Sequence, residues 1–466
     1  MSKLHDFGLV GLGVMGRNFI LNVVDNGFTA CGLDLDPEKV AALKEEGDED
    51  KVTATTSGEE FVKSLKTPRK IMLLVPAGGP VDGVIESLLP FIDKGDLLID
   101  GGNSFYTDTD RREKYLSEKG YHFIGTGVSG GAKGARFGPS IMPGGSEEAY
   151  EFVRPIFEAV SAKANGEPCV TYLGPKSAGN YVKMVHNGIE YGMMQLISEV
   201  YDLLKKACGL TNDELHEVFD NWNKGRLQSF LVDITTEIFL QKADDSDERL
   251  VDLILDKAKQ KGTGKWTSQN AMDLGIAVPT IDAAVSLREL SAKKDERVAA
   301  EAVYGKPIVA PADKEAFIQK AEAALYFSFI LSYAQGFTQL KAASDEYGYN
   351  LDMEAIARIW RGGCIIRAGL LEDIRTAFKK DEKLPHLLLD GGIAEQIKGS
   401  VGATREVVSF AVQNGVPAAA LTASLSYFDV FTSGRLPLNL VQAQRDHFGA
   451  HTYERIDKDG IFHTEW

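Results

Sequence analysis

Apolar and helical stretches alternate along the first 175 residues of the chain. Five short apolar runs predict strands, at 7–12, 29–35, 70–75, 96–100 and 121–128. The stretches between them are long enough for crossover helices, and Met15–Asn26 has apolar residues at helical spacing. This alternation predicts a mainly parallel, doubly wound sheet of the Rossmann type, in which ligands bind beyond the carboxyl ends of the strands.

The pattern changes after residue 176, where strand signals stop and long helical periodicities take over. We therefore expect an α/β domain over residues 1–176, a large all-α domain over 177–433 and a C-terminal tail over 434–466.

The helical part contains an internal echo. Trp222-x-x-Gly225 followed by LVDI resembles Trp360-x-x-Gly363 followed by LEDI, 138 residues further on. The echo predicts a duplicated helical unit. Core tryptophans explain it adequately, and no chemistry is attached to it.

Composition narrows the classes of partner. The chain has 466 residues, 44% of them hydrophobic, and a formal charge of −16, which disfavours nucleic acid or an anionic membrane as a partner. No apolar run is long enough for a signal segment or a membrane span, and the four cysteines form no CxxC pair. We expect a cytoplasmic protein without a disulfide framework or a zinc site.

The turn after the first predicted strand reads GLGVMG and has chemical meaning in that position. Gly11 allows a tight turn, Gly13 lets a pyrophosphate approach the backbone, and Gly16 lets the helix pack against the strand. The alternative is a purely structural glycine turn. The predicted cofactor site adds residues of this turn and of two later strand ends, namely Leu12, Val14, Met15, Val75, Pro76, Ala77 and Asn103.

Asp34 ends the second predicted strand, 18 residues after Gly16. A carboxylate there can accept both ribose hydroxyls of NAD and repels the 2′-phosphate of NADP. Leu35 and Asp36 follow where an arginine would be needed to bind that phosphate, and Lys39 is the nearest cation. The sequence therefore favours NAD, unless these acids only end a strand and cap a helix.

Three polar loops follow predicted strands, at 76–79, 100–103 and 129–145. The third is expected to be too glycine-rich for a packed element. Its Ser129-Gly130-Gly131 start can present backbone N–H groups to a carboxylate, although glycine loops also simply turn chains.

KMVHNGIEY, from Lys183 to Tyr191, places several polar groups on one helix face. At 3.6 residues per turn they fall within roughly 140° of arc. The five side chains are those of Lys183, His186, Asn187, Glu190 and Tyr191. They could take up a proton, return one and align a substrate, whereas the simpler interpretation is a solvated face.

Three further groups are suited to bind an anion. KGTGKW places Lys261 and Thr263 around two glycines, which could hold a phosphate or could form a solvated basic turn. Arg288 lies in the apolar segment AAVSLREL, where a buried guanidinium requires an anionic partner. Arg445 and His451 lie in an aromatic tail that we expect to dock into another subunit.

Together these motifs resemble the 6-phosphogluconate dehydrogenase family along the whole chain. The resemblance rests on GLGVMGRN, DGGNS, GVSGGAKGARFGPSIMPGG, KMVHNGIEYG, KGTGKW and QAQRDHFGAHTYE. It implies oxidation of 6-phosphogluconate at C3, loss of CO₂ and release of ribulose 5-phosphate by a metal-independent homodimer that uses NAD or NADP.

The resemblance also implies roles for individual residues. Lys183 corresponds to the general base and later acid at C3, and Glu190 to the acid that protonates C1. Residues expected to hold the carboxylate and hydroxyls are Asn103, Ser129, Gly130, Gly131, His186 and Asn187. Residues expected to hold the phosphate are Tyr191, Lys261, Thr263 and Arg288, with Arg445 and His451 from the partner subunit.

The sequence departs from the familiar NADP-using members at a few positions. Asp34-Leu35-Asp36 replaces Asn-Arg-Thr and Gly13 replaces Ala, which favours NAD. Ala132-Lys133 and Met193 also differ, and the sequence does not explain them. The alternatives are a 3-hydroxyacid dehydrogenase of the same superfamily and a non-catalytic dinucleotide-binding protein.

Overall fold

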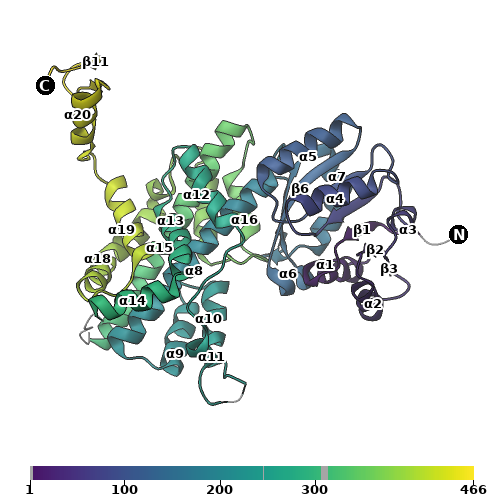
Figure 1. Ribbon diagram of the computed structural model, residues 1–466, viewed down its shortest axis with the longest axis horizontal. Helices are drawn as coiled ribbons and strands as arrows, with labels where there is room; N and C mark the ends of the chain where they lie inside the picture. Colours follow the sequence, from purple (N-terminus) through teal and green to yellow (C-terminus); the bar gives the residue numbers. More distant parts are fainter. Residues whose placement is uncertain (1–3, 245, 306–312) are drawn as a thin grey trace.

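The computed structural model describes residues 4–244, 246–305 and 313–466, which form an α/β lobe, a helical lobe and a projecting tail (Figure 1). The α/β lobe contains a seven-stranded sheet in the order β3-β2-β1-β4-β5-β6-β7. The strands are β1 (Phe7–Val10), β2 (Ala30–Leu33), β3 (Val52–Thr55), β4 (Lys70–Leu73), β5 (Leu97–Asp100), β6 (His122–Ser129) and β7 (Ser140–Gly145). All pairs are parallel except β6 with β7, which confirms the doubly wound prediction.

Helices cover both faces of this sheet. Phe19 and Phe157 pack on one face, and Phe61 and Ile85 pack on the other. The helices of the lobe are α1 (Val14–Asp25), α2 (Pro37–Glu46), α3 (Gly58–Lys63), α4 (Gly79–Leu88), α5 (Tyr106–Glu118), α6 (Gly131–Phe137) and α7 (Glu147–Val160). A small hairpin, β8 (Lys163–Ala164) with β9 (Glu167–Pro168), leads into the helical lobe.

Two expectations about strands and loops were wrong. The glycine-rich segment 129–145 is packed: it forms α6 and the edge strand β7, whose glycines are buried. Those glycines have a steric reason, since a Cβ on Gly144 would lie 2.3 Å from the backbone nitrogen of Gly179. Strands also occur after residue 176, where β10 (Tyr453–Glu454) pairs with β11 (Ile461–Phe462) in the tail. The short strand β3 was not predicted.

Two long helices form the centre of the helical lobe, α8 (Ala178–Cys208) and α15 (Lys314–Tyr347). They approach closely, because a Cβ on Gly336 of α15 would lie 2.5 Å from the Ile189 side chain. The other helices are α9 (Asn212–Asn223), α10 (Phe230–Leu240), α11 (Leu250–Leu253), α12 (Thr263–Asp273), α13 (Pro279–Ser291), α14 (Lys294–Tyr304), α16 (Met353–Trp360), α17 (Leu370–Lys380), α18 (Gly391–Gln413), α19 (Ala419–Phe431) and α20 (Leu438–Gly449).

The two tryptophan segments lie in the same core. Trp222 and Trp360 are both buried, and the loops that follow them pair with each other. Phe230 N donates to Arg367 O at 3.0 Å, and Gly369 N donates to Gln228 O at 2.9 Å. Such reciprocal pairing suits two copies of one helical unit related by a local two-fold axis, and the duplication remains a prediction.

The tail stands away from the helical lobe at the upper left of Figure 1. Its fold depends on Asp446, whose buried carboxylate accepts hydrogen bonds from Thr452 N, Thr464 N and Trp466 Nε1 at 2.9–3.0 Å. Leu438, Leu440, Val441 and Phe448 are exposed on α20. An exposed apolar surface of this kind is typical of an interaction site.

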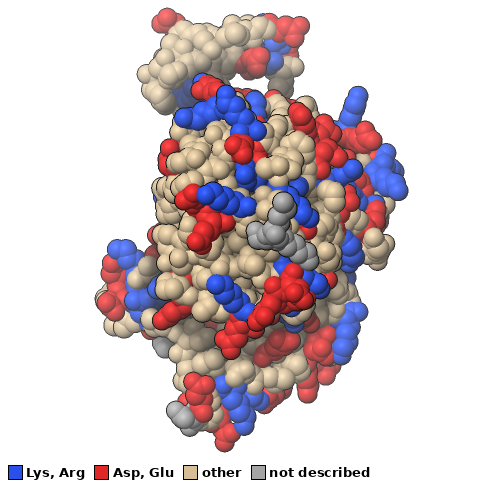
Figure 2. All heavy atoms as spheres, turned by 90° about the vertical axis from the view of Figure 1, so that its right-hand side faces the viewer, with Lys and Arg blue, Asp and Glu red and all other residues tan. Residues whose placement is uncertain are grey.

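The outer surface carries both signs of charge. On the face seen in Figure 2, Lys and Arg are interspersed with Asp and Glu, without a continuous basic area. Among the helices of the described residues, none is long and apolar enough to cross a membrane.

Candidate active site

The polar face of α8 is buried where the helix crosses the sheet edge. Glycines of β6 and β7 make this crossing possible, because a Cβ on Gly127 would lie 2.3 Å from Cβ of Lys183. Lys183 is 6% exposed and His186 is fully buried, which rules out the solvated-face interpretation. The helix therefore carries its lysine into the junction between the lobes.

Hydrogen bonds connect the side chains of this face. Lys183 Nζ donates to Asn187 Oδ1 at 2.8 Å, and His186 Nδ1 lies 3.0 Å from the same oxygen. The Glu190 carboxylate lies 3.8 Å from His186 Nδ1, one turn further along. The spacing predicted from the sequence thus becomes a contiguous polar array.

Burial shifts the pKa of each titratable group in this array. Desolvation lowers the pKa of Lys183 below its usual range, against the opposing field of Glu190. Desolvation also raises the pKa of Glu190, and together with the charge of Lys183 it lowers the pKa of His186 well below the usual value. These shifts favour a neutral amine, a protonated carboxyl and a neutral imidazole.

The Ser129 loop lies against this array. Ser129 Oγ lies 3.2 Å from His186 Nε2, and Ile365 N donates to the same oxygen at 3.4 Å. Gly130 and Gly131 follow with φ of 120° and 62° at the start of α6, and a Cβ on Gly130 would lie 2.5 Å from Gly363 O. Glycine is required here because L side chains rarely adopt these angles.

Two predicted phosphate ligands reach the other end of the α8 face. Asn187 Nδ2 donates to Thr263 Oγ1 at 3.2 Å, and the Arg288 guanidinium stacks on the Tyr191 ring at 3.4 Å. Arg288 forms no ion pair with any carboxylate in the described part of the chain, and burial lowers its pKa. A half-buried guanidinium without an anionic partner is suited to bind an anion.

Four predicted site residues are not joined to this array within the chain. Asn103 is exposed after β5, and Lys261 is exposed just before α12. Arg445 and His451 are exposed on the tail, where Arg445 Nη1 bonds Gln442 Oε1 and His451 packs edge-on against Phe448. The tail helix α20 stands away from α8 in Figure 1.

A cavity of about 660 Å³ lies at the glycine turn after β1. Of the predicted cofactor residues, Gly11, Gly13, Asp34, Leu35, Val75 and Pro76 line it. A Cβ on Gly13 would meet nothing within 4 Å, whereas one on Gly16 would lie 1.9 Å from Gly11 O. Open backbone at one glycine and tight packing at the other fit a pyrophosphate at the start of α1.

Other predicted cofactor residues have different surroundings. Leu12 is buried and donates its N–H to Asp34 Oδ2 at 2.7 Å, so it fixes the acid. Val14 and Ala77 are exposed beside the turn, and Met15 is partly buried. Lys39 Nζ lies 3.6 Å from Asp34 and 3.7 Å from Asp36, which leaves this group of three with a net negative charge.

The end of α16 and the segment after it lie beside the site, and sequence reasoning missed them. Trp360, to which the sequence gave only a core role, packs edge-on against His186 with ring centroids 5.6 Å apart. Cys364 is buried near Lys183, and the field of that lysine opposes the rise in the pKa of the thiol. The signal was available in the GGC triplet after Trp360, since paired glycines mark a close backbone approach.

Comparison with known proteins identifies the family of both lobes. The sequence model described as the NAD binding domain of 6-phosphogluconate dehydrogenase matches residues 6–174. The model described as the 6-phosphogluconate dehydrogenase C-terminal domain matches residues 179–466. The chain belongs to the 6-phosphogluconate dehydrogenase family.

Individual members of the 6-phosphogluconate dehydrogenase family match from end to end. The chain is 54% identical to the NADP(+)-dependent, decarboxylating enzyme of Bacillus subtilis (strain 168) and 52% identical to the decarboxylating enzyme of Escherichia coli (strain K12), each over the full length of both proteins. The solved 6-phosphogluconate dehydrogenase of Plasmodium falciparum superposes with a TM-score of 0.95 at 46% identity, covering 99% of this chain and 100% of that one. The alternative of a 3-hydroxyacid dehydrogenase is not favoured.

Proposed function

We propose that the chain catalyses oxidative decarboxylation of 6-phosphogluconate to ribulose 5-phosphate and CO₂, with reduction of a nicotinamide dinucleotide. The observation that carries this function is the buried array of Lys183, His186 and Asn187, which lies against Ser129 in a chain aligned throughout with decarboxylating 6-phosphogluconate dehydrogenases. The cofactor, when bound at the glycine turn, accepts a hydride.

Lys183 takes the proton from the C3 hydroxyl in the first step. Its desolvated site favours the neutral amine, which a base requires, and Asn187 Oδ1 fixes the direction of Nζ. Neutral His186 and Ser129 position the substrate hydroxyls without adding charge. Loss of the C3 hydrogen as hydride then leaves a β-keto acid.

The ammonium formed on Lys183 assists the second step. It donates to the C3 ketone oxygen while the carboxylate leaves as CO₂, so the developing enolate charge is neutralised. Glu190, whose pKa is raised by burial, then delivers a proton to C1 of the enediol. Because the pKa shifts of Lys183 and Glu190 are opposite, one lobe junction can supply both a base and an acid.

The substrate phosphate is assigned to the far end of the α8 face. Arg288, stacked on Tyr191, and Thr263 beside Asn187 provide a cation and a hydroxyl there, and Lys261 adds a second cation. We infer that Arg445 and His451 complete this cradle from a second copy of the chain. The exposed apolar side chains of α20 and its separation from its own lobe support tail exchange in a homodimer.

The proposed reaction is tested by the absorbance at 340 nm after NAD or NADP and 6-phosphogluconate are added, with CO₂ measured in parallel. A rise in absorbance with equimolar CO₂ is expected. Reduction of the cofactor without CO₂ would refute decarboxylation, and no reduction with either cofactor would refute the proposal as a whole.

We further propose that NAD is preferred over NADP. Asp34, Asp36 and Lys39 present a net negative charge where the 2′-phosphate of NADP would lie, and exposed Leu35 offers it no donor. The expected result is a kcat/KM for NAD above that for NADP, reversed by Asp34→Asn combined with Leu35→Arg. Arg154→Ala, a surface change on α7, is the control. A higher kcat/KM for NADP in the unaltered chain would contradict the preference.

We infer that the reaction takes place in the cytoplasm. The four cysteines form no disulfide and three are buried, which supports a reducing compartment.

A further inference from the structure

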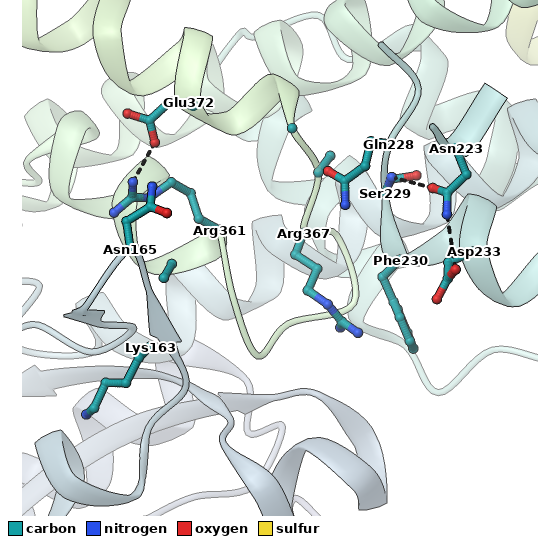
Figure 3. Close-up of a pocket in the computed structure, with 13 residues that line it drawn as sticks. Lys163, Asn165, Asn223, Gln228, Ser229, Phe230, Asp233, Arg361, Arg367 and Glu372 are labelled. Carbon is teal, nitrogen blue, oxygen red and sulfur yellow. Dashed lines mark hydrogen bonds and ion pairs between the residues drawn. The ribbon is translucent and has the colours of Figure 1, made fainter. Parts of the chain in front are cut away.

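A cavity separate from the catalytic array lies where the helical lobe meets the β8–β9 hairpin (Figure 3). Its volume is about 530 Å³, within the range typical of small-molecule sites. Three segments line it, from 163–165, 223–233 and 361–372. None of the lining residues belongs to the predicted substrate or cofactor sites.

Arg367 is the cation best placed to receive a ligand in this cavity. Its guanidinium stacks on the Phe230 ring at 3.7 Å and donates to Cys364 O at 2.7 Å. No carboxylate in the described part of the chain forms an ion pair with it, and burial lowers its pKa. Arg361, by contrast, is paired with Glu167 and Glu372. Arg367 therefore has donors left for a planar oxyanion.

The rest of the lining suits hydroxyl groups. The side chains of Asn165 and Gln228 are exposed and make no hydrogen bond with any residue that the structure describes. Asp233 accepts a hydrogen bond from Asn223 at 3.0 Å and retains acceptor capacity. The two lining acids, Asp233 and Glu372, disfavour a ligand with several phosphates. The lining therefore suits a ligand with a single anionic group and a polar, uncharged body.

We propose that this cavity binds a sugar monophosphate, with the phosphate on Arg367 and the sugar hydroxyls on Asn165, Gln228 and Asp233. Two 11-residue helices, α10 and α17, begin at the cavity, and their N-terminal dipoles add to the attraction for the phosphate.

Segment 361–372 connects the cavity to the loop that begins at Ser129. Gly363 O accepts from Ser140 N at 2.8 Å, and Ile365 N, two residues before Arg367, donates to Ser129 Oγ at 3.4 Å. A ligand that fixes Arg367 also restrains the backbone that holds Ser129. We expect occupancy to change the affinity for the catalytic substrate, and this consequence rests on the proposed function.

Isothermal titration of the full chain with glucose 6-phosphate tests the site. An Arg288→Ala background weakens binding in the catalytic cleft, so the remaining binding reports the cavity. One equivalent per chain is expected, with inorganic phosphate about tenfold weaker and sorbitol without measurable binding. Arg367→Gln should weaken binding about tenfold or more, since it removes a charged hydrogen-bond donor.

Two further variants keep the test decisive. Asn165→Asp changes an exposed side chain to a carboxylate of the same shape, and repulsion should weaken phosphate binding without affecting the fold. Arg358→Gln, on α16 and paired with Glu354 outside the cavity, is the matched control and should bind as the background does. Unchanged affinity in both Arg367→Gln and Asn165→Asp, or equal binding of phosphate and glucose 6-phosphate, would overturn the sugar phosphate site.

Steady-state kinetics test the coupling. Glucose 6-phosphate should change the KM for 6-phosphogluconate differently in the unaltered chain and in Arg367→Gln. In the unaltered chain it can occupy both the catalytic cleft and the cavity, whereas in Arg367→Gln it can occupy only the cleft. Identical inhibition in the two proteins would overturn the coupling. A chain that binds glucose 6-phosphate at the cavity but has no dehydrogenase activity would refute the proposed function and leave the site intact.

Discussion

Lys183 owes its chemistry to its surroundings more than to its type. In solution its amine would be charged at neutral pH, whereas at the lobe junction burial favours the neutral form. Replacing it by methionine keeps the apolar stem and removes the proposed base. We expect turnover to fall by about 10²–10⁴-fold.

Cofactor affinity is the control for Lys183→Met, measured by titration calorimetry. It should be unchanged, because the glycine turn lies on another element. A loss of turnover smaller than tenfold would argue against a base at this position.

The same residue predicts a pH dependence. The base must be neutral, so kcat/KM falls as pH decreases below the pKa of Lys183. Because burial lowers that pKa, the acid limb should lie below the ordinary lysine value of about 10.4. A pH profile of kcat/KM at saturating cofactor measures it. The residual activity of Lys183→Met should lack this acid limb. If the limb persists in Lys183→Met, it belongs to the titration of another group.

At the scale of the element, α8 also fixes the position of α19, far from the proposed catalytic residues. The buried Glu199 carboxylate accepts from Ala420 N at 2.8 Å and Leu421 N at 2.9 Å, the first turn of α19. Glu199→Ala leaves both donors without this partner, at a cost of about 1–3 kcal/mol for each unsatisfied group. We expect a lower Tm by scanning calorimetry with near-normal KM. Glu217→Ala, exposed on α9, is the matched control and should leave Tm unchanged.

Sequence periodicity predicts elements well where one pattern dominates. The strands around Gly11 and Asp34 and the helix of Lys183 follow directly from it, because alternation and 3.6-residue spacing reflect burial. The segment 129–145 did not, since its glycines serve close packing against distant parts of the chain, such as Gly144 against α8 and Gly130 against Gly363, which only the assembled structure shows. A local pattern cannot distinguish glycine that turns a chain from glycine that admits a neighbour.

Periodicity predicted the candidate site only within one helix, α8. Residues 183–191 share a face by helical geometry, so their proximity needs no tertiary information. Contacts between different elements could not be predicted from the sequence pattern alone. Trp360 beside His186 and Ile365 N on Ser129 Oγ depend on how α16 and its following loop pack.

At the scale of the whole molecule, the tail is the part whose proposed role depends on a second chain. Ending the chain before Gln442 removes Arg445, His451 and part of the apolar face of α20. We expect the KM for 6-phosphogluconate to rise by about tenfold or more, because charged phosphate contacts are lost. Steady-state kinetics and light scattering measure the effect and the oligomeric state. An unchanged KM would refute tail exchange.

A narrower variant separates tail folding from tail contacts. Asp446→Asn keeps every residue of the cradle but replaces the carboxylate that accepts from Thr452, Thr464 and Trp466. It should raise KM less than truncation does.

An arm that leaves its own body and serves a neighbour makes each proposed site a joint product of two chains. Two defective proteins can then restore each other when mixed. A Lys183→Met chain lends an intact tail to a truncated chain, whose lysine is intact, so one of the two sites in each mixed dimer works. At a substrate concentration well below the raised KM of the truncated chain, each variant alone should have little activity. Random pairing of equal amounts makes half of the dimers mixed, so co-refolding should recover about a quarter of the activity of the unaltered dimer. Self-contained subunits would recover none.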